Sequence, residues 1–196
     1  PQVIFTKLSV LDISINIPGA GYIGGDVYCE KRCRSEYAST TNVTLTVYPN
    51  PGFQFQEWSG GCTGTATTST VSMETSKSDT ANVLDTRKTL KVSLTGTGAG
   101  STGFKIISNY GGSGGISCPP QCEAKFPIVD GQNIILYPIY SQLGILVDNF
   151  SGPCTLQKFG VEQVRCENLI MDSDKTVTAN VATVPIKTIS VSVTGP

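Results

Sequence analysis

The sequence contains no histidine, and this absence narrows the chemistry open to the chain. Without an imidazole base, no serine or cysteine can be activated in the usual nucleophile–base arrangement. Haem attachment through a Cys-x-x-Cys-His motif is excluded for the same reason. No pair of carboxylates stands in a recognisable glycosidase context. We therefore predict that the chain is not an enzyme, has no catalytic residues and binds no cofactor.

Charged residues are also scarce, at 15% of the 196 residues with a net charge of −1, where about a quarter is usual. No basic patch is present to bind nucleic acid or a membrane surface. No apolar run approaches the roughly 18 residues that span a bilayer. Thr, Ser, Gly and Asn take the place of charge, and this composition suits strands and turns. We predict a β-protein that binds no nucleic acid and does not insert into membranes.

Cysteine, by contrast, is abundant, with seven residues in the chain. This number and spacing favour disulfides formed in an oxidising compartment, which predicts an extracellular protein. The alternative is a zinc site at Cys29-x3-Cys33 and Cys118-x3-Cys122. It would need an atypical set made only of cysteine, because the usual close pair is Cys-x2-Cys with histidine nearby. We favour disulfides and predict no metal site.

The sequence repeats itself in five ordered matches. The spacing between matched segments grows along the chain while their order is kept, as expected of one fold that carries loop insertions. The matches pair Cys29 and Cys33 with Cys118 and Cys122, residues 42–45 with 133–136, residues 58–60 and Cys62 with 150–152 and Cys154, Met73 and residues 80–83 with Met171 and residues 178–181, and residues 89–96 with 188–195.

These matches divide the chain into two tandem units and the start of a third. We expect β-domains at residues 1–85 and 86–184, and at 185–196 the first strand of a third unit or an assembly strand, so the native protein would continue. Apolar residues alternate with period two, as at Val43, Leu45 and Val47, which indicates strands with one wet face. The predicted fold is all-β: two small antiparallel, disulfide-stapled domains, each a sandwich or β-grasp-like.

Local pairing is the simplest scheme for the cysteines of the second unit. It joins Cys118 to Cys122 and Cys154 to Cys166, with residues 155–165 as an inserted loop. Two further connectivities are open. The first unit keeps Cys29 and Cys33, but its Cys62 lacks the matching second cysteine, and by alignment Thr68 lies near the empty position. Cys62 is then either a buried free thiol or the partner of an intermolecular disulfide.

Trp58 and Phe150 occupy equivalent positions before the Ser-Gly-x-Cys corners of the two units. We expect both to fill the small cores. A lone tryptophan in an extracellular β-protein can instead stack on sugar, but the equivalent position holds an ordinary phenylalanine.

The second unit carries the most extensive motif. Its residues are Leu90, Val92, Gly98, Gly100, 115–118, Cys122, Phe126, Gly131, Leu136, 150–152, Cys154, Met171, Lys175 and 177–181. This pattern resembles the divergent InlB B-repeat-type bacterial domains that occur in tandem on large secreted and surface proteins. The first unit departs from the pattern by lacking the final cysteine and in residues 74–79. The resemblance implies an all-β or β-grasp-like module with spacer, adhesive or assembly roles and without catalytic residues.

The leading hypothesis is therefore a non-catalytic structural or adhesive module of a cell-surface or filamentous assembly. Its partners would be copies of itself or adjacent repeats, joined through edge strands such as residues 2–10 or 188–194, because an added strand satisfies an exposed sheet edge.

The alternative is a carbohydrate-binding module of a secreted enzyme. Surface glycans would then stack on tyrosine rings, for which the candidates are Tyr22, Tyr28, Tyr110, Tyr137 and Tyr140. Asn42 and Asn149 begin glycosylation sequons, which matter only if the source organism glycosylates asparagine.

Overall fold

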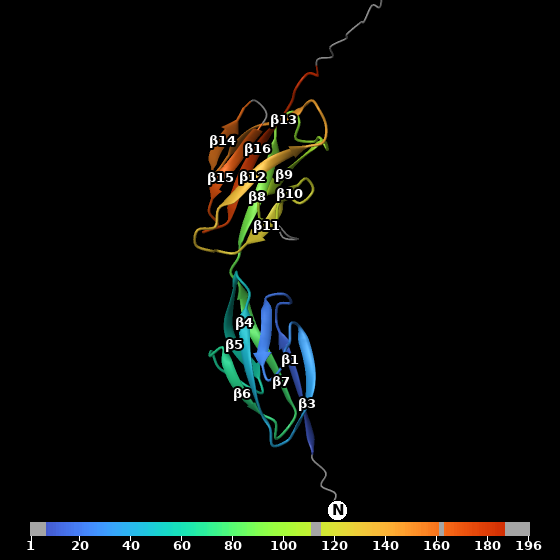
Figure 1. The fold of residues 1–196 in the computed structure, drawn as a ribbon, viewed down its shortest axis with the longest axis vertical. Helices are drawn as coiled ribbons and strands as arrows, with labels where there is room; N and C mark the ends of the chain where they lie inside the picture. Colours follow the sequence, from blue (N-terminus) through green and yellow to red (C-terminus); the bar gives the residue numbers. More distant parts are fainter. Residues whose placement is uncertain (1–6, 111–114, 161–162, 187–196) are drawn as a thin grey trace, which may run out of the picture. The chain divides into compact units, whose positions relative to one another are not determined.

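The computed structural model describes residues 7–110, 115–160 and 163–186. The chain forms two compact units, residues 1–87 and 88–196, which Figure 1 shows in blue to green and in green to red. Every regular element of the described ranges is a strand, so the all-β, disulfide-stapled fold class is confirmed. Within those ranges no helix is long and apolar enough to cross a membrane. The expected third-unit strand at 185–196 lies almost entirely outside the described residues.

The first unit contains two sheets. One, which we call its closing sheet, has the order β3-β1-β7-β5, and the other, its opposite sheet, has the order β2-β4-β6. The strands are β1 (Leu8–Ile15), β2 (Gly21–Gly25), β3 (Arg32–Ala38), β4 (Asn42–Pro49), β5 (Phe53–Gly60), β6 (Thr68–Ser72) and β7 (Lys77–Asp85).

The second unit repeats this arrangement with two additional strands. Its closing sheet has the order β11-β8-β16-β13, and its opposite sheet has the order β10-β9-β12-β15-β14. The strands are β8 (Lys88–Thr95), β9 (Phe104–Ser108), β10 (Ser117–Cys118), β11 (Glu123–Phe126), β12 (Ile134–Tyr140), β13 (Ile145–Ser151), β14 (Thr155–Phe159), β15 (Gln163–Leu169) and β16 (Lys175–Thr183).

The first and last strands of each unit lie side by side and run parallel. β1 pairs with β7 from Leu11–Lys77 to Ile15–Ala81, and β8 pairs with β16 in the same way. The sequence led us to expect antiparallel pairing, which holds for the remaining strand pairs described. Period-two alternation shows which face of a strand is buried but carries no information on the direction of its neighbours. Parallel pairing puts the start of β1 and the end of β7 at opposite ends of the unit.

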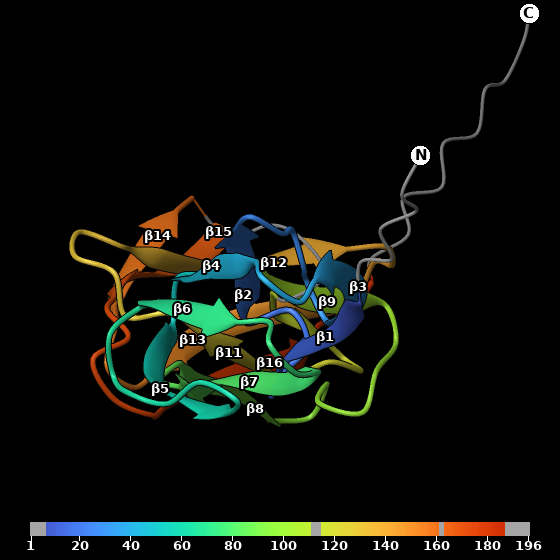
Figure 2. The same cartoon turned by 90° about the horizontal axis from the view of Figure 1, so that it is seen from below.

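The strands of each unit form two layers (Figure 2). The buried apolar residues of each unit form one core cluster. Val43, Leu45 and Val47 point into the first core, as their alternation predicts. Trp58 and Phe150 are both buried, at 2% and 4% exposure. The Trp58 ring nitrogen also donates to the carbonyl of Ala66 at 3.0 Å, which ties the tryptophan to the loop that leads into β6.

The segment 155–165, expected as an inserted loop, is instead largely a hairpin. β14 pairs antiparallel with β15 from Thr155–Glu167 to Phe159–Gln163. Two polar residues, Gln157 and Lys158, separate the apolar Leu156 from Phe159. This spacing breaks the period-two alternation that indicates a half-buried strand. The insertion therefore adds a strand to the edge of the opposite sheet.

Gly60 and Gly152 form equivalent corners before the cysteine that follows β5 and β13. Gly60 has φ of +115°, and a Cβ there would lie 2.0 Å from the carbonyl oxygen of Ser78. Gly152 has φ of +133° and faces the carbonyl oxygen of Thr176 at 2.8 Å. The glycines let β5 and β13 approach the last strand of each unit closely.

We predict that Gly60→Ala lowers the free energy of unfolding of the first unit by about 3 kcal/mol, because it adds left-handed strain and a backbone collision. Gly64→Ala is the matched control, since Gly64 has φ of +125° but no atom within 4 Å of an added Cβ. It should cost only about 1 kcal/mol. Urea unfolding of both variants gives the comparison, and equal losses would contradict the close approach.

Candidate functional site

Six of the seven cysteines are joined in local pairs. The disulfides link Cys29 to Cys33, Cys118 to Cys122 and Cys154 to Cys166. These bonds use the sulfur atoms that the zinc alternative required. In the described ranges no group of three or more potential ligands is placed to hold a metal ion.

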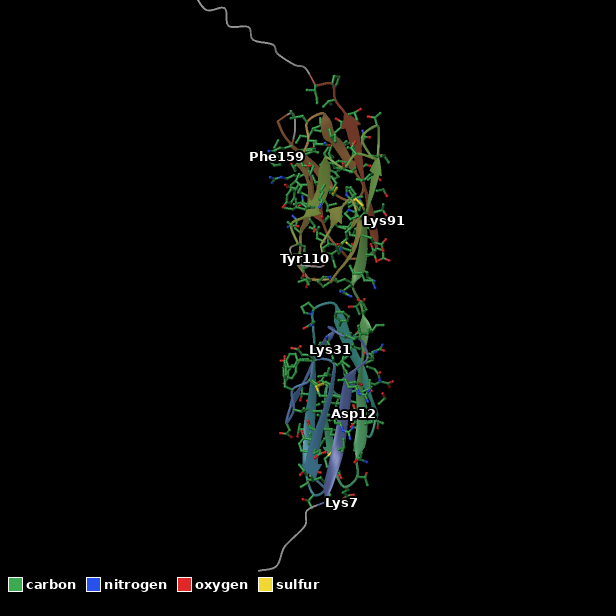
Figure 3. The ribbon with its side chains drawn as sticks, turned by 90° about the vertical axis from the view of Figure 1, so that its right-hand side faces the viewer. Lys7, Asp12, Lys31, Lys91, Tyr110 and Phe159 are labelled. Carbon is green, nitrogen blue, oxygen red and sulfur yellow. A yellow bond between two sulfur atoms is a disulfide. The ribbon has the colours of Figure 1, made fainter. Side chains whose placement is uncertain are left out.

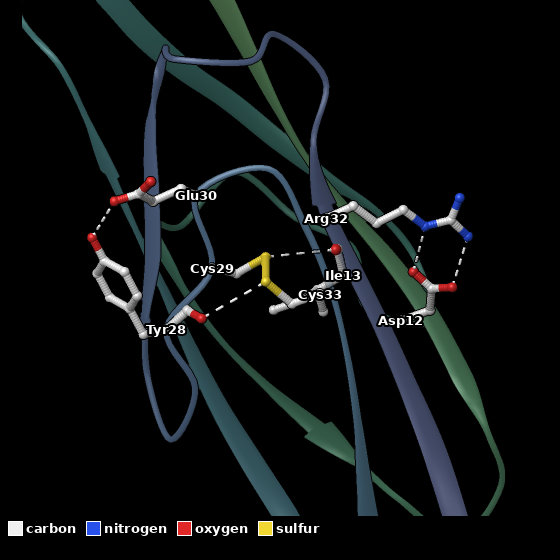
Figure 4. Close-up of a disulfide and its surroundings, with 7 residues drawn as sticks. All are labelled: Asp12, Ile13, Tyr28, Cys29, Glu30, Arg32 and Cys33. Carbon is white, nitrogen blue, oxygen red and sulfur yellow. Dashed lines mark hydrogen bonds and ion pairs between the residues drawn. A yellow bond between two sulfur atoms is a disulfide. The ribbon is translucent and has the colours of Figure 1, made fainter.

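The Cys29–Cys33 disulfide closes the loop between β2 and β3 (Figure 4). Within this loop the Tyr28 hydroxyl donates to the Glu30 carboxylate at 2.6 Å. Arg32 forms a bidentate ion pair with Asp12 of β1, at 2.9 and 2.7 Å. The arginine holds the pKa of the Asp12 carboxyl below its ordinary value. The loop is thus attached at both ends, which orients Tyr28 and Glu30.

Cys62 is unpaired and buried, with 8% exposure. Burial is the main reason that the pKa of its thiol rises to about 11, although a hydrogen bond with Ser69 acts in the opposite direction. Its backbone N–H donates to the carboxylate of Asp79 at 2.5 Å. A protonated, buried thiol is a poor nucleophile, so Cys62 is badly placed for a bond to another chain.

Ser69, not Thr68, occupies the position of the missing cysteine. Leu45 of β4 lies opposite Ser69, just as its counterpart Leu136 of β12 lies opposite Cys166. Thr68 points outward, where its hydroxyl lies 3.0 Å from that of Thr46. Sequence alignment missed this by one residue because the β12–β15 register shifts through a bulge, which moves the cysteine by one position.

The five tyrosines considered for sugar stacking lie in different surroundings in the two units. Tyr22 and Tyr28 lie together, 5.3 Å between ring centroids, and Tyr48 stacks on Tyr22 at 4.8 Å. Tyr48 was not among the residues singled out from the sequence, because only the β2–β4 register places it opposite Tyr22.

In the described part of the second unit, the aromatic residues form no cluster of three tyrosines. The Tyr110 ring packs on Phe126, and the Tyr140 hydroxyl accepts from the N–H of Val147 at 2.9 Å. Tyr137 lies beside the guanidinium of Arg165, which also covers Phe159 at 4.9 Å. Tyr110 and Phe159 lie towards different ends of the unit (Figure 3).

The two sequon asparagines differ in their surroundings. Asn42 is exposed at the start of β4. The Asn149 side-chain oxygen is buried within β13. Asn42 is therefore the more exposed of the two sequon asparagines.

The opposite sheets of the two units differ at one edge. β6 is the last strand of the first unit's opposite sheet, whereas its counterpart β15 is covered by β14. β6 has the sequence Thr-Ser-Thr-Val-Ser, without charge, proline or glycine. An uncharged, β-branched edge strand is a template for another strand.

We predict that Ser69→Cys forms a disulfide with Cys62, because it restores the cysteine pair of the second unit. The bond should stabilise the first unit by about 2 kcal/mol under oxidising conditions. Thr68→Cys is the control and should keep two free thiols, since its side chain faces solvent. Non-reducing mass spectrometry with thiol counting distinguishes them, and a bond in the Thr68 variant alone would refute the assignment of Ser69.

Comparison with known proteins gives one family match and several distant structural matches. Residues 19–83 match the family model of the divergent InlB B-repeat domain. No curated protein sequence matches the chain.

The solved structures that match include pilins. The major pilin of Streptococcus pyogenes is 12% identical, with a TM-score of 0.32 and coverage of 92% of this chain and 100% of that chain. The minor pilin GBS52 of Streptococcus agalactiae is 10% identical, with a TM-score of 0.28 and coverage of 94% and 100%. TM-scores this low carry no argument on fold or assembly.

The family match falls on the first unit, although the sequence motif is more extensive in the second. The strands β10 and β14 of the second unit interrupt the pattern that the two units share. The resemblance inferred from the sequence is confirmed for the first unit, where residues 19–83 match the divergent InlB B-repeat domain model.

Proposed function

We propose that this chain is a non-catalytic, load-bearing module of an extracellular cell-surface protein. The observation that carries the proposal is the parallel pairing of the first and last strands in each unit. In many domains the chain ends lie close together. Here the chain enters and leaves each unit at opposite ends, as a module in a tandem series requires.

The parallel pair also determines how tension acts on a unit. A pull on the start of β1 and the end of β7 is directed along two hydrogen-bonded neighbours. The ladder is then loaded in shear, so that several hydrogen bonds must break together. Pulling antiparallel neighbours apart from one end breaks their bonds one after another. The disulfides indicate an oxidising compartment, and the divergent InlB B-repeat match agrees with a surface role.

We expect the first unit to resist tension much more strongly along the chain than across it. In single-molecule pulling of the full chain, handles at Lys7 and Arg87 should give an unfolding force several times that with handles at Lys7 and Thr40. The second pair opens the β1–β3 ladder from its end, where Leu8 lies opposite Ala38. Both measurements use the same protein, so they differ only in the direction of the applied force. Equal forces would refute the load-bearing role.

The open β6 edge supports a second function, lateral association with neighbouring copies. The other three edges of the first unit are protected. β3 carries Arg32, Arg34 and Glu36, and β5 has a bulge next to Glu57. The outer side of β2 is covered at Ile23, which exchanges two backbone hydrogen bonds with Cys29. Charges and bulges both discourage added strands. β6 has neither, and in the second unit the same edge holds a fifth strand.

The backbone of Thr70 faces this open edge. Opposite it, Thr44 of β4 directs both its N–H and its carbonyl to Asp26, on the far side of β4. Thr44 and Thr70 are therefore a pair without mutual hydrogen bonds. The N–H and carbonyl of Thr70 point away from β4 and are positioned to pair with an incoming strand.

The structure limits which segment can supply the partner strand. Of the segments expected from the sequence, residues 8–10 are already paired with β3 inside the unit. Residues 2–6 and 188–194 lie outside the described residues. We propose residues 188–194 of a neighbouring copy, since their sequence repeats the alternation of β8.

We predict that Thr70→Pro abolishes concentration-dependent association, because proline removes the outward N–H without touching the β4–β6 ladder. Sedimentation velocity of the disulfide-intact chain measures the association. Thr70→Ala keeps the N–H and should associate like the parent chain. A parent chain that stays monomeric at millimolar concentration, or a proline variant that associates normally, would exclude pairing at β6.

A further inference from the structure

We propose that Tyr22, Tyr28 and Tyr48, with the cavity beside Tyr22, form a binding site for an uncharged pyranose residue of an oligosaccharide. The proposal goes beyond the structural role above, because it assigns a ligand to a defined place on the first unit. It uses the outer face of the opposite sheet and the loop closed by Cys29 and Cys33.

The three rings form one aromatic cluster. Tyr22 and Tyr48 lie opposite each other on β2 and β4, with ring planes inclined by only 18°. Tyr28 continues the cluster at 39° to Tyr22. Tyr28 is 65% exposed and Tyr48 is 46% exposed. Such large aromatic exposure on a sheet whose other face is a well-packed core calls for a partner.

A cavity of about 270 Å³ adjoins Tyr22, and its other lining residues are Gly19, Gly21, Glu30, Lys31 and Asn50. Its volume is close to the lower end of ligand pockets, on the order of 300 Å³, which suits a single sugar residue. Glu30 provides a hydrogen-bond acceptor and Lys31 a donor. The Asn50 amide is oriented by its own bond to the carbonyl of Gly19, at 3.0 Å.

Close contacts position the rings before any ligand arrives. A Cβ at Gly24 would lie 3.0 Å from the Tyr48 ring, so the glycine lets that ring lie down on β2. Tyr28 is held by the hydrogen bond to Glu30 and by the adjacent disulfide (Figure 4). A ligand therefore meets side chains that are already ordered, which reduces the entropy lost on binding.

The chemistry of the site favours a neutral sugar. A pyranose has an apolar C–H face and a rim of hydroxyl groups, and here an aromatic plane lies next to a donor and an acceptor. Glu30 and Lys31 balance in charge, which gives no net attraction for an anion. In the second unit, by contrast, the Arg165 guanidinium already covers the face of Phe159. Among the described residues, no guanidinium lies over the ring of Tyr22, Tyr28 or Tyr48.

The test is binding of the full, disulfide-intact chain to an array of neutral, sialylated and sulfated oligosaccharides, with decaproline as a peptide probe. We expect retention on neutral pyranose oligosaccharides. Calorimetry with the best-bound oligosaccharide should show a loss of affinity of about tenfold or more for Tyr48→Ala and for Tyr28→Ala. Lys31→Gln should weaken binding less.

Phe159→Ala is the matched control, because it removes an exposed aromatic ring from the second unit and should leave binding unchanged. Tyr28 lies outside the strands, so its variant keeps the test valid if Tyr48→Ala disturbs the sheet, as thermal unfolding would reveal. Three outcomes overturn the proposal: no neutral oligosaccharide is bound, only sulfated sugars or decaproline are bound, or both tyrosine variants bind like the parent chain. Association through β6 uses backbone groups and would be unaffected by any of these.

Discussion

The pairing of the first strand with the last determines how each unit is built. β1 and β7 are separated by almost the whole unit in sequence, yet they are central neighbours in the closing sheet. Every other strand is added beside this pair or across the core from it. The same pair places the chain ends at opposite ends of the unit, so that folding and end-to-end connection depend on one ladder. The load-bearing role proposed above depends on this combination.

Much of the fold follows from the sequence, because the alternation of apolar residues and the order of the repeated segments both reflect burial. Val43, Leu45 and Val47 point into the core because a strand with one wet face must alternate. Trp58 and Phe150 are buried at equivalent corners for the same reason. Strand direction could not be predicted, because parallel and antiparallel neighbours bury the same face of a strand.

The candidate sites depend on register, which sequence spacing does not determine. Tyr48 joins Tyr22 only because β2 and β4 pair at those residues. Tyr110, Tyr137 and Tyr140, chosen by residue type, have different neighbours in the second unit. Ser69 replaces a cysteine one position away from the aligned Thr68, because the second unit has a bulge that the first lacks. A one-residue shift turns a side chain to the other face of the sheet.

The second unit has a second disulfide that the first unit lacks. In the second unit, β14 is inserted between the residues that form the Cys154–Cys166 bond. A longer insertion has more conformational freedom to lose on folding, and a disulfide across it removes part of that freedom from the unfolded chain. In the first unit the link between Cys62 and Ser69 is shorter, and a hydrogen bond joins the two side chains. The disulfide thus spans the additional strand, which covers an edge in the second unit that the first leaves open.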